Sequence, residues 1–71
     1  MRYFYGEECV DGTRIYVAGR INGAGKEYIG IGGSFTREAG KAHNYGKSGT
    51  AKKAKKMLCR GRHPSETINL R

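Results

Sequence analysis

Two turn dipeptides, Asp11-Gly12 and Asn22-Gly23, constrain the fold of this chain more than any other feature. They separate three runs: RYFYGEECV, which carries aromatic and β-branched residues at intervals, and TRIYVAGRI and KEYIGIGGSF, whose large apolar residues recur at even steps. Asp-Gly and Asn-Gly tolerate positive φ, so between alternating runs they favour the tight turns of β-hairpins. The pattern predicts a three-stranded antiparallel meander over residues 2–35. The alternative is that residues 2–10 form a loose arm instead of a strand.

The side chains of the predicted strands sort onto two faces. In the middle run, one face carries Ile15, Val17 and Ile21, and the other carries Tyr16, Ala18 and Arg20. In the third run, Ile29, Ile31 and Phe35 are separated by even steps, as on one face of a strand. This run also contains three glycines, which mark either a bulge or the close approach of another backbone. At these positions, Gly30, Gly32 and Gly33, we favour a simple bulge, where the sheet bends, over a ligand site.

A single helix is predicted in the C-terminal half, over residues 50–60. The segment AKKAKKMLC has a helix-forming composition, Ser48 and Thr50 are N-cap candidates, and Gly61 and Pro64 offer a stop. The lysines 52, 53 and 56 share one arc of this helix, with Lys55 near its border. The opposite arc is apolar and carries Ala51, Ala54, Met57 and Leu58. We expect the helix to pack across the sheet through Ala51, Ala54 and Leu58.

Two further segments bear on the size of the sheet. Residues 41–46, KAHNYG, are either a short edge strand or an irregular connection, and residues 67–70, TINL, could return as a last strand. A chain of 71 residues accommodates one small domain with a thin core. We therefore expect a single α+β domain over residues 1–71, as a monomer or a homodimer. It should hold an antiparallel meander of three or four strands with one basic amphipathic helix packed on one face.

Charge is distributed unevenly along the chain. Lys and Arg total 14 and Asp and Glu total 6, which gives a net charge of +8. Residues 1–36 contain four basic and four acidic residues, whereas residues 37–71 contain ten basic residues against Glu38 and Glu66. Such asymmetry indicates an anionic partner for the C-terminal half. No long apolar run and no secretory signal are visible, so we expect a cytoplasmic protein without a membrane partner.

The motifs for catalysis or cofactor binding are incomplete. GAGK at 23–26 resembles a phosphate-binding loop, but that motif needs glycine where the chain has Arg20, and serine or threonine where it has Glu27. The glycines of GIGG at 30–33 lack the third glycine of a dinucleotide fingerprint. We therefore expect no enzymatic activity and no cofactor.

The thiol and imidazole groups are few: Cys9, Cys59, His43 and His63. No C-x₂-C pair is present, and Cys59-x₃-His63 is only half of a zinc site, so we expect no metal. Two cysteines are too few for a disulfide scaffold, and we expect them to be reduced, as small hydrophobes at the edge of the core. A disulfide bridge or a metal shared by the two thiols are the alternatives.

The basic helix is the main functional signal. Lysine clusters neutralise phosphates and release counterions without reading base edges, which favours binding to the nucleic-acid backbone. We expect phosphate contacts from Lys52, Lys53, Lys55, Lys56, Arg60 and Arg62, extended by Arg37, Lys41 and Lys47. Tyr28 and Tyr45 lie near basic residues and are candidates for stacking on bases. The alternative is a solvated helix face that is kept basic for solubility.

One resemblance is carried by GRINGAGKEYIGIGG, Phe35-Thr36 and Thr50-Ala51-x-x-Ala54. Together they resemble the three-stranded arm-binding domains of lambda-type integrases and the plant ethylene-response DNA-binding domain. The resemblance implies that the sheet enters the major groove with Arg14, Arg20, Lys26 and Tyr28. This chain departs from the pattern because its sheet half has no net charge and about a dozen extra residues separate strand and helix.

A second resemblance is to small orphan proteins of phages and mobile elements. It is carried by GGSFTREAGKAHNYGKSGTAKKAKKML within residues 31–58. Phage proteins of this size often bind and redirect a host complex, including the nucleases of bacterial defence. We therefore expect a phage-encoded, non-catalytic accessory protein that binds nucleic acid or a nucleoprotein complex in the host cytoplasm. The alternative is an anti-CRISPR-like inhibitor that binds a host protein complex.

Overall fold

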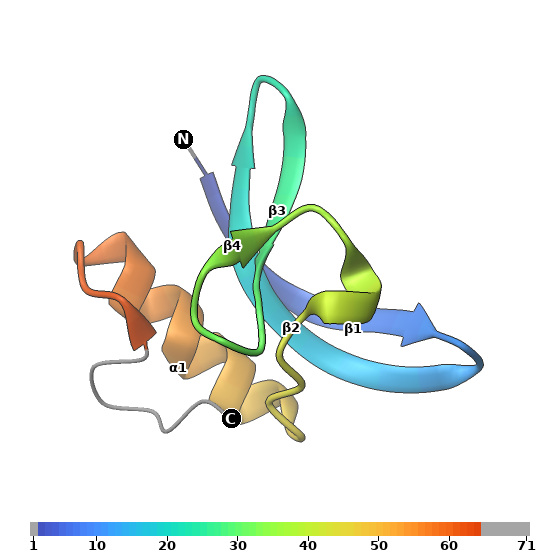
Figure 1. Cartoon of the computed structure of the whole chain (residues 1–71). Coiled ribbons are helices and arrows are strands. Elements are labelled where there is room, and N and C mark those ends of the chain that lie inside the picture. The colour runs from blue at the N-terminus through green and yellow to red at the C-terminus, as the bar shows by residue number, and fades with distance from the viewer. Residues whose placement is uncertain (1, 65–71) are drawn as a thin grey trace.

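The computed structural model describes residues 2–64 of the chain (Figure 1). Strands β1 (Arg2–Val10), β2 (Thr13–Asn22) and β3 (Gly25–Ile29) form an antiparallel meander, and the short β4 (Phe35–Thr36) pairs with β3. The 3-10 turn η1 (Ala39–Lys41) and the helix α1 (Ser48–Cys59) complete the domain. The predicted α+β fold, a four-stranded antiparallel sheet with one helix packed on it, is confirmed. Residues 2–10 form a full strand and not a loose arm.

Both turn dipeptides join strands as predicted. Asp11 and Gly12 have φ values of 50° and 77°, the left-handed values that a tight two-residue hairpin turn requires. At the second turn, the Asn22 side-chain oxygen accepts the Ala24 N–H at 2.9 Å, and Asn22 pairs with Gly25 across the turn. These two turns fix the register of the whole meander.

The third strand is shorter than predicted, because it ends at Ile29 instead of reaching residue 35. The Gly30 N–H donates to the Ser34 carbonyl oxygen at 2.7 Å, and a β-carbon on Gly30 would lie 2.8 Å from that oxygen. The glycine therefore marks the close approach of another backbone, and the expected bulge within a longer strand is wrong. Ile31, expected on the apolar face, lies in the turn and is 49% exposed.

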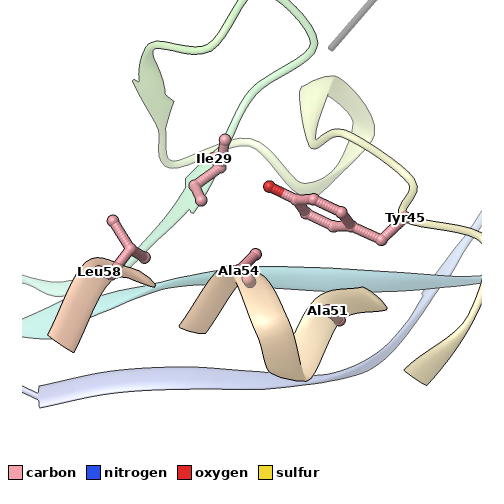
Figure 2. Packing of buried hydrophobic residues seen from close by; sticks show 6 residues of the cluster. Ile29, Tyr45, Ala51, Ala54 and Leu58 are labelled. Carbon is pink, nitrogen blue, oxygen red and sulfur yellow. The ribbon is translucent and has the colours of Figure 1, made fainter. Parts of the chain in front are cut away.

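Helix α1 covers one face of the sheet. Ala51 and Ala54 are fully buried and Leu58 is buried, and they pack in one cluster with Ala18 and Ile29 of the sheet. Figure 2 shows Ile29 and the Tyr45 ring facing these helix residues. The predicted contact residues of the helix are confirmed. Two alanines at the contact let the helix approach the sheet closely.

Turn η1 lies on the other face of the sheet. Val17 and Tyr28 are buried there together with Ala42, and Ala39 of η1 packs against this second cluster. Because side chains alternate along a strand, Val17 and Ala18 point to opposite faces. The sheet is therefore covered by α1 on one side and by the η1 segment on the other.

Residues 42–45 carry the chain from one face to the other across the edge of β2. The Tyr45 N–H donates to the Tyr16 carbonyl oxygen at 2.9 Å, and Asn44 Oδ1 accepts the Tyr16 N–H at 3.2 Å. Only an isolated bridge, Gly30↔Ala42, joins this segment to the end of β3. Of the two interpretations of residues 41–46, the irregular connection is the one observed.

The C-terminal end of α1 agrees with the prediction, whereas its N-terminal end differs from it. Lys47 is the N-cap and makes no side-chain cap bond, so the two predicted N-caps, Ser48 and Thr50, are wrong and lie inside the helix. The C-terminal stop is confirmed, since Gly61 has a φ of 74° and its N–H donates to the Leu58 carbonyl at 3.0 Å. The strand predicted at residues 67–70 lies outside the described residues. No helix within residues 2–64 is long and apolar enough to cross a membrane.

Candidate nucleic-acid interface

The outward face of α1 is basic because the buried alanines fix the rotation of the helix. With Ala51 and Ala54 against the sheet, the side chains of Lys52, Lys53 and Lys56 are exposed. Lys55 lies at the border and is half-buried, with its Nζ 5.8 Å from the centre of the Tyr5 ring. The helix contains no acidic residue. Every charged residue on its exposed face is therefore cationic.

The turn after α1 brings two arginines beside the lysines of the last helical turns. The Arg62 N–H donates to the Met57 carbonyl oxygen at 2.9 Å, so the chain folds back along the helix at Gly61. This closes a hollow of about 260 Å³, lined by Lys53, Lys56, Met57, Arg60 and Arg62. We call it the basic hollow. It collects four cationic side chains around one apolar residue.

Three of the acidic side chains within residues 2–64 are paired with cations outside the basic hollow. Glu27 binds Arg20 at 2.9 Å, Glu38 binds Lys41 at 3.0 Å, and Glu7 lies 3.9 Å from Arg14. Within residues 2–64, no salt bridge joins a carboxylate to the lysines of α1 or to Arg60. The negative end of the helix dipole favours cations at this terminus, but it offsets only a fraction of their charge. The basic hollow therefore concentrates positive charge that the salt bridges of the described residues do not balance at Lys53, Lys56 and Arg60.

The remaining predicted cations lie outside the basic hollow. Lys47 is exposed at the N-cap of α1, and Arg37 is exposed just after β4. Lys41 belongs to η1 on the opposite side of the sheet, and its ammonium is paired with Glu38. The structure therefore gathers Lys53, Lys56, Arg60 and Arg62 in one place, keeps Lys52 and Lys55 on the same helix, and leaves Arg37, Lys41 and Lys47 dispersed.

The two tyrosines proposed for stacking are part of the core. Tyr28 and Tyr45 are each 7% exposed, so neither ring offers an open face to a base. The Tyr28 hydroxyl donates to Glu8, and this hydrogen bond, together with burial, raises the Tyr28 pKa to about 12. Burial raises the Tyr45 pKa to about 12 as well. The stacking role predicted for these two residues is thus replaced by a structural one.

The sheet residues implied by the integrase resemblance do not share one surface. Arg14 and Arg20 belong to the face that α1 covers, whereas Lys26 and Tyr28 belong to the opposite face, by the strand register. Arg14 is exposed, but Arg20 is held between Glu27 and the Phe35 ring. The structure does not bring these four side chains together.

A second hollow, which the sequence did not predict, lies at the same end of α1. It measures about 170 Å³ and is lined by Tyr3, Phe35 and His63, by Arg20 and Arg62, and by Leu58 and Gly61. We call it the aromatic hollow. Its residues come from β1, β2, β4 and the end of α1, so no local sequence pattern signals it. Arg62 lines both hollows.

The thiols and imidazoles are dispersed. Cys9 and Cys59 are both exposed and form no disulfide. The expectation that they pack at the edge of the core is therefore wrong. Across residues 2–64, no three His, Cys, Asp or Glu side chains come together in a group that could hold a metal ion. Burial lowers the pKa of His43, whose ring packs against Tyr45 with centroids 4.5 Å apart. His63 instead borders the aromatic hollow.

Comparison of the chain with known protein families, with curated proteins and with solved structures finds no match.

Proposed function

We propose that this protein binds nucleic acid, free or within a nucleoprotein complex, and does so without catalysing a reaction. The observation that supports the proposal is the basic hollow. Lys53, Lys56 and Arg60 converge there with Arg62, and among the described residues no carboxylate neutralises the first three. A phosphate backbone supplies the closely spaced negative charges that such a cluster attracts, with release of counterions.

The composition of the surface favours the phosphate backbone over base sequence. The outward face of α1 contains lysines, which act as point charges, while the bidentate reading of guanine edges requires arginine in a groove. Arg60 and Arg62 lie at the end of the helix, in the turn, and not along a face that could follow the major groove. We therefore propose binding that depends weakly on sequence. We place it in the cytoplasm, where thiols such as Cys9 and Cys59 stay reduced.

The test is the salt dependence of binding, measured by fluorescence anisotropy with labelled single strands and duplexes. We expect binding at low salt that weakens steeply as salt is added, because each phosphate contact releases a counterion. No binding to any nucleic acid at low salt would overturn the proposal. The same surface would then serve an acidic protein partner, as in a phage-encoded inhibitor of a host complex.

A further inference from the structure

The two hollows at the end of α1 differ in chemistry and share one residue. The basic hollow is cationic, whereas the aromatic hollow presents the rings of Tyr3, Phe35 and His63. Arg62 lines both of them. In a nucleic-acid strand, each base is attached through its sugar to a neighbouring phosphate, so the two groups lie side by side. An anion site that adjoins a ring site is therefore matched to a nucleotide.

We propose that the protein recognises an unpaired nucleotide, whose base enters the aromatic hollow while adjoining phosphates lie in the basic hollow. The inference rests on the proposed function and adds the class of nucleic acid: a single strand, an overhang or a loop. Arg62 lies where the sugar-phosphate backbone passes from one hollow to the other.

The aromatic hollow has walls that are already fixed. The Arg20 guanidinium lies 3.8 Å from the centre of the Phe35 ring, and its Nε donates to Glu27 at 2.9 Å. The His63 ring meets Phe35 edge-on, with centroids 5.8 Å apart. Because these planes are held by contacts within the protein, a planar ligand meets a surface that needs little ordering on binding.

The charge and size of the aromatic hollow also favour a base over a second phosphate. Glu27 balances the charge of Arg20, so the wall of the hollow is mainly aromatic, and its remaining arginine is Arg62, on the side of the basic hollow. Its volume of about 170 Å³ is below the roughly 300 Å³ at which pockets for drug-sized ligands begin. A single ring system suits a hollow of this size. Aromatic rings and guanidinium planes are the groups on which unpaired bases stack in proteins.

A paired base cannot use this hollow. In a duplex each base is stacked and hydrogen-bonded, and taking it out of the helix costs unpairing and unstacking energy. We therefore expect preference for single strands over blunt duplex, with weak base preference, since every base has a π-face.

The experiment compares Tyr3→Leu and His63→Ala with the control Tyr5→Leu. Tyr3 and Tyr5 lie on the same strand and face, but Tyr5 is 39% exposed and lines neither hollow. Each protein is titrated by anisotropy with oligo-dT, oligo-rU and a blunt hairpin duplex, at one salt concentration. Circular dichroism melts establish that each variant is folded, and His63→Ala, which alters no strand, serves if Tyr3→Leu fails to fold.

We expect the unmodified protein to bind a single strand about tenfold more tightly than the duplex. Tyr3→Leu and His63→Ala should each weaken single-strand binding about fivefold or more. They should leave duplex binding unchanged, and Tyr5→Leu should change neither. A strand that carries 2-aminopurine adds a direct readout, because stacking of that base quenches its fluorescence. Preference for either oligo-dT or oligo-rU supports the inference and identifies the sugar that is favoured.

Three results would overturn the inference. Equal affinity for single strand and duplex, with the steep salt dependence intact, would leave the proposed function standing and remove the base site. Unchanged single-strand affinity in folded Tyr3→Leu and His63→Ala would also remove the base site and leave the proposed function standing. Absence of binding to every nucleic acid, with binding of an acidic, tyrosine-containing peptide instead, would remove both proposals and assign the two hollows to a protein partner.

Discussion

The Arg62 N–H donates to the Met57 carbonyl oxygen at 2.9 Å, across the end of α1. This bond folds the chain back on the last helical turn and places Arg62 beside Lys53, Lys56 and Arg60. The reversal depends on Gly61, whose φ of 74° suits glycine and strains other residues. One backbone turn therefore completes the basic hollow and also separates it from the aromatic hollow.

Replacing Gly61 should loosen this turn. We expect Gly61→Ala to lower the free energy of unfolding by about 1 kcal/mol, because an L-residue is disfavoured at that φ, and to weaken nucleic-acid binding. The matched control is Gly49→Ala in the first turn of α1, where a β-carbon meets open space. That change should stabilise the fold by about 0.5 kcal/mol. Urea titrations measure both, and equal effects of the two substitutions would contradict the account.

The two buried tyrosines should respond in opposite ways to loss of the hydroxyl. The Tyr45 hydroxyl is buried and finds no hydrogen-bond partner among the described residues, so Tyr45→Phe should raise the free energy of unfolding, by about 1 kcal/mol. Tyr28→Phe removes the donor to the half-buried Glu8 and should lower it by a similar amount. Thermal melts distinguish these outcomes. Destabilisation by Tyr45→Phe would show that this hydroxyl has a partner.

Alkaline pH should unfold the domain through these same tyrosines. Both have a pKa raised to about 12, against 10.0 for an unperturbed tyrosine: that of Tyr28 by its hydrogen bond to Glu8 and by burial, and that of Tyr45 by burial. Above pH 10 the unfolded chain releases protons that the folded chain keeps. The stability they contribute is therefore complete below pH 10 and is lost as pH rises toward 12.

The measurement is the urea midpoint at a series of pH values between about 8 and 12. The unmodified protein should show a decline that begins near pH 10. The double variant Tyr28→Phe/Tyr45→Phe should lose a large part of it, since phenylalanine does not titrate. An identical decline in both proteins would assign the effect to other groups.

The salt dependence should report the number of phosphate contacts. If Lys52, Lys53, Lys56, Arg60 and Arg62 each neutralise one phosphate, log Kd should rise with log salt with a slope of about 4.5 on duplex and about 3.5 on single strands. A slope below about 1 would mean that the basic face of α1 does not contact the backbone.

The local parts of the fold could be predicted from the sequence because short segments determine them. Asp11-Gly12 adopts the left-handed turn that its composition favours, and Gly61 ends α1 as expected. The apolar arc of the helix also follows from spacing alone, and this spacing places Ala51, Ala54 and Leu58 on the side that contacts the sheet.

The other features depend on contacts between distant segments. The end of β3 at Gly30 is set by the backbones of Ser34 and Lys41, which lie close to it in space. Tyr45 reaches the core only because residues 42–45 cross the edge of β2, a path that no spacing reveals. The aromatic hollow likewise joins β1, β4 and the turn after α1. This domain has few large apolar residues, so Tyr28 and Tyr45 help to fill its core. Their position beside basic residues in the sequence had indicated a surface role.

The most direct test of the central claim compares two double variants that remove equal charge. Lys53→Gln/Lys56→Gln alters the basic hollow, and Arg14→Gln/Lys26→Gln alters the sheet; each lowers the net charge by two, from +8 to +6. Nucleic-acid affinity is measured by anisotropy over a range of salt. We predict that the first pair weakens binding about tenfold or more and reduces the salt slope by about 1.8 on duplex, while the second changes affinity by about twofold at most. Equal losses from the two pairs, or a larger loss from the sheet pair, would contradict binding through the basic hollow.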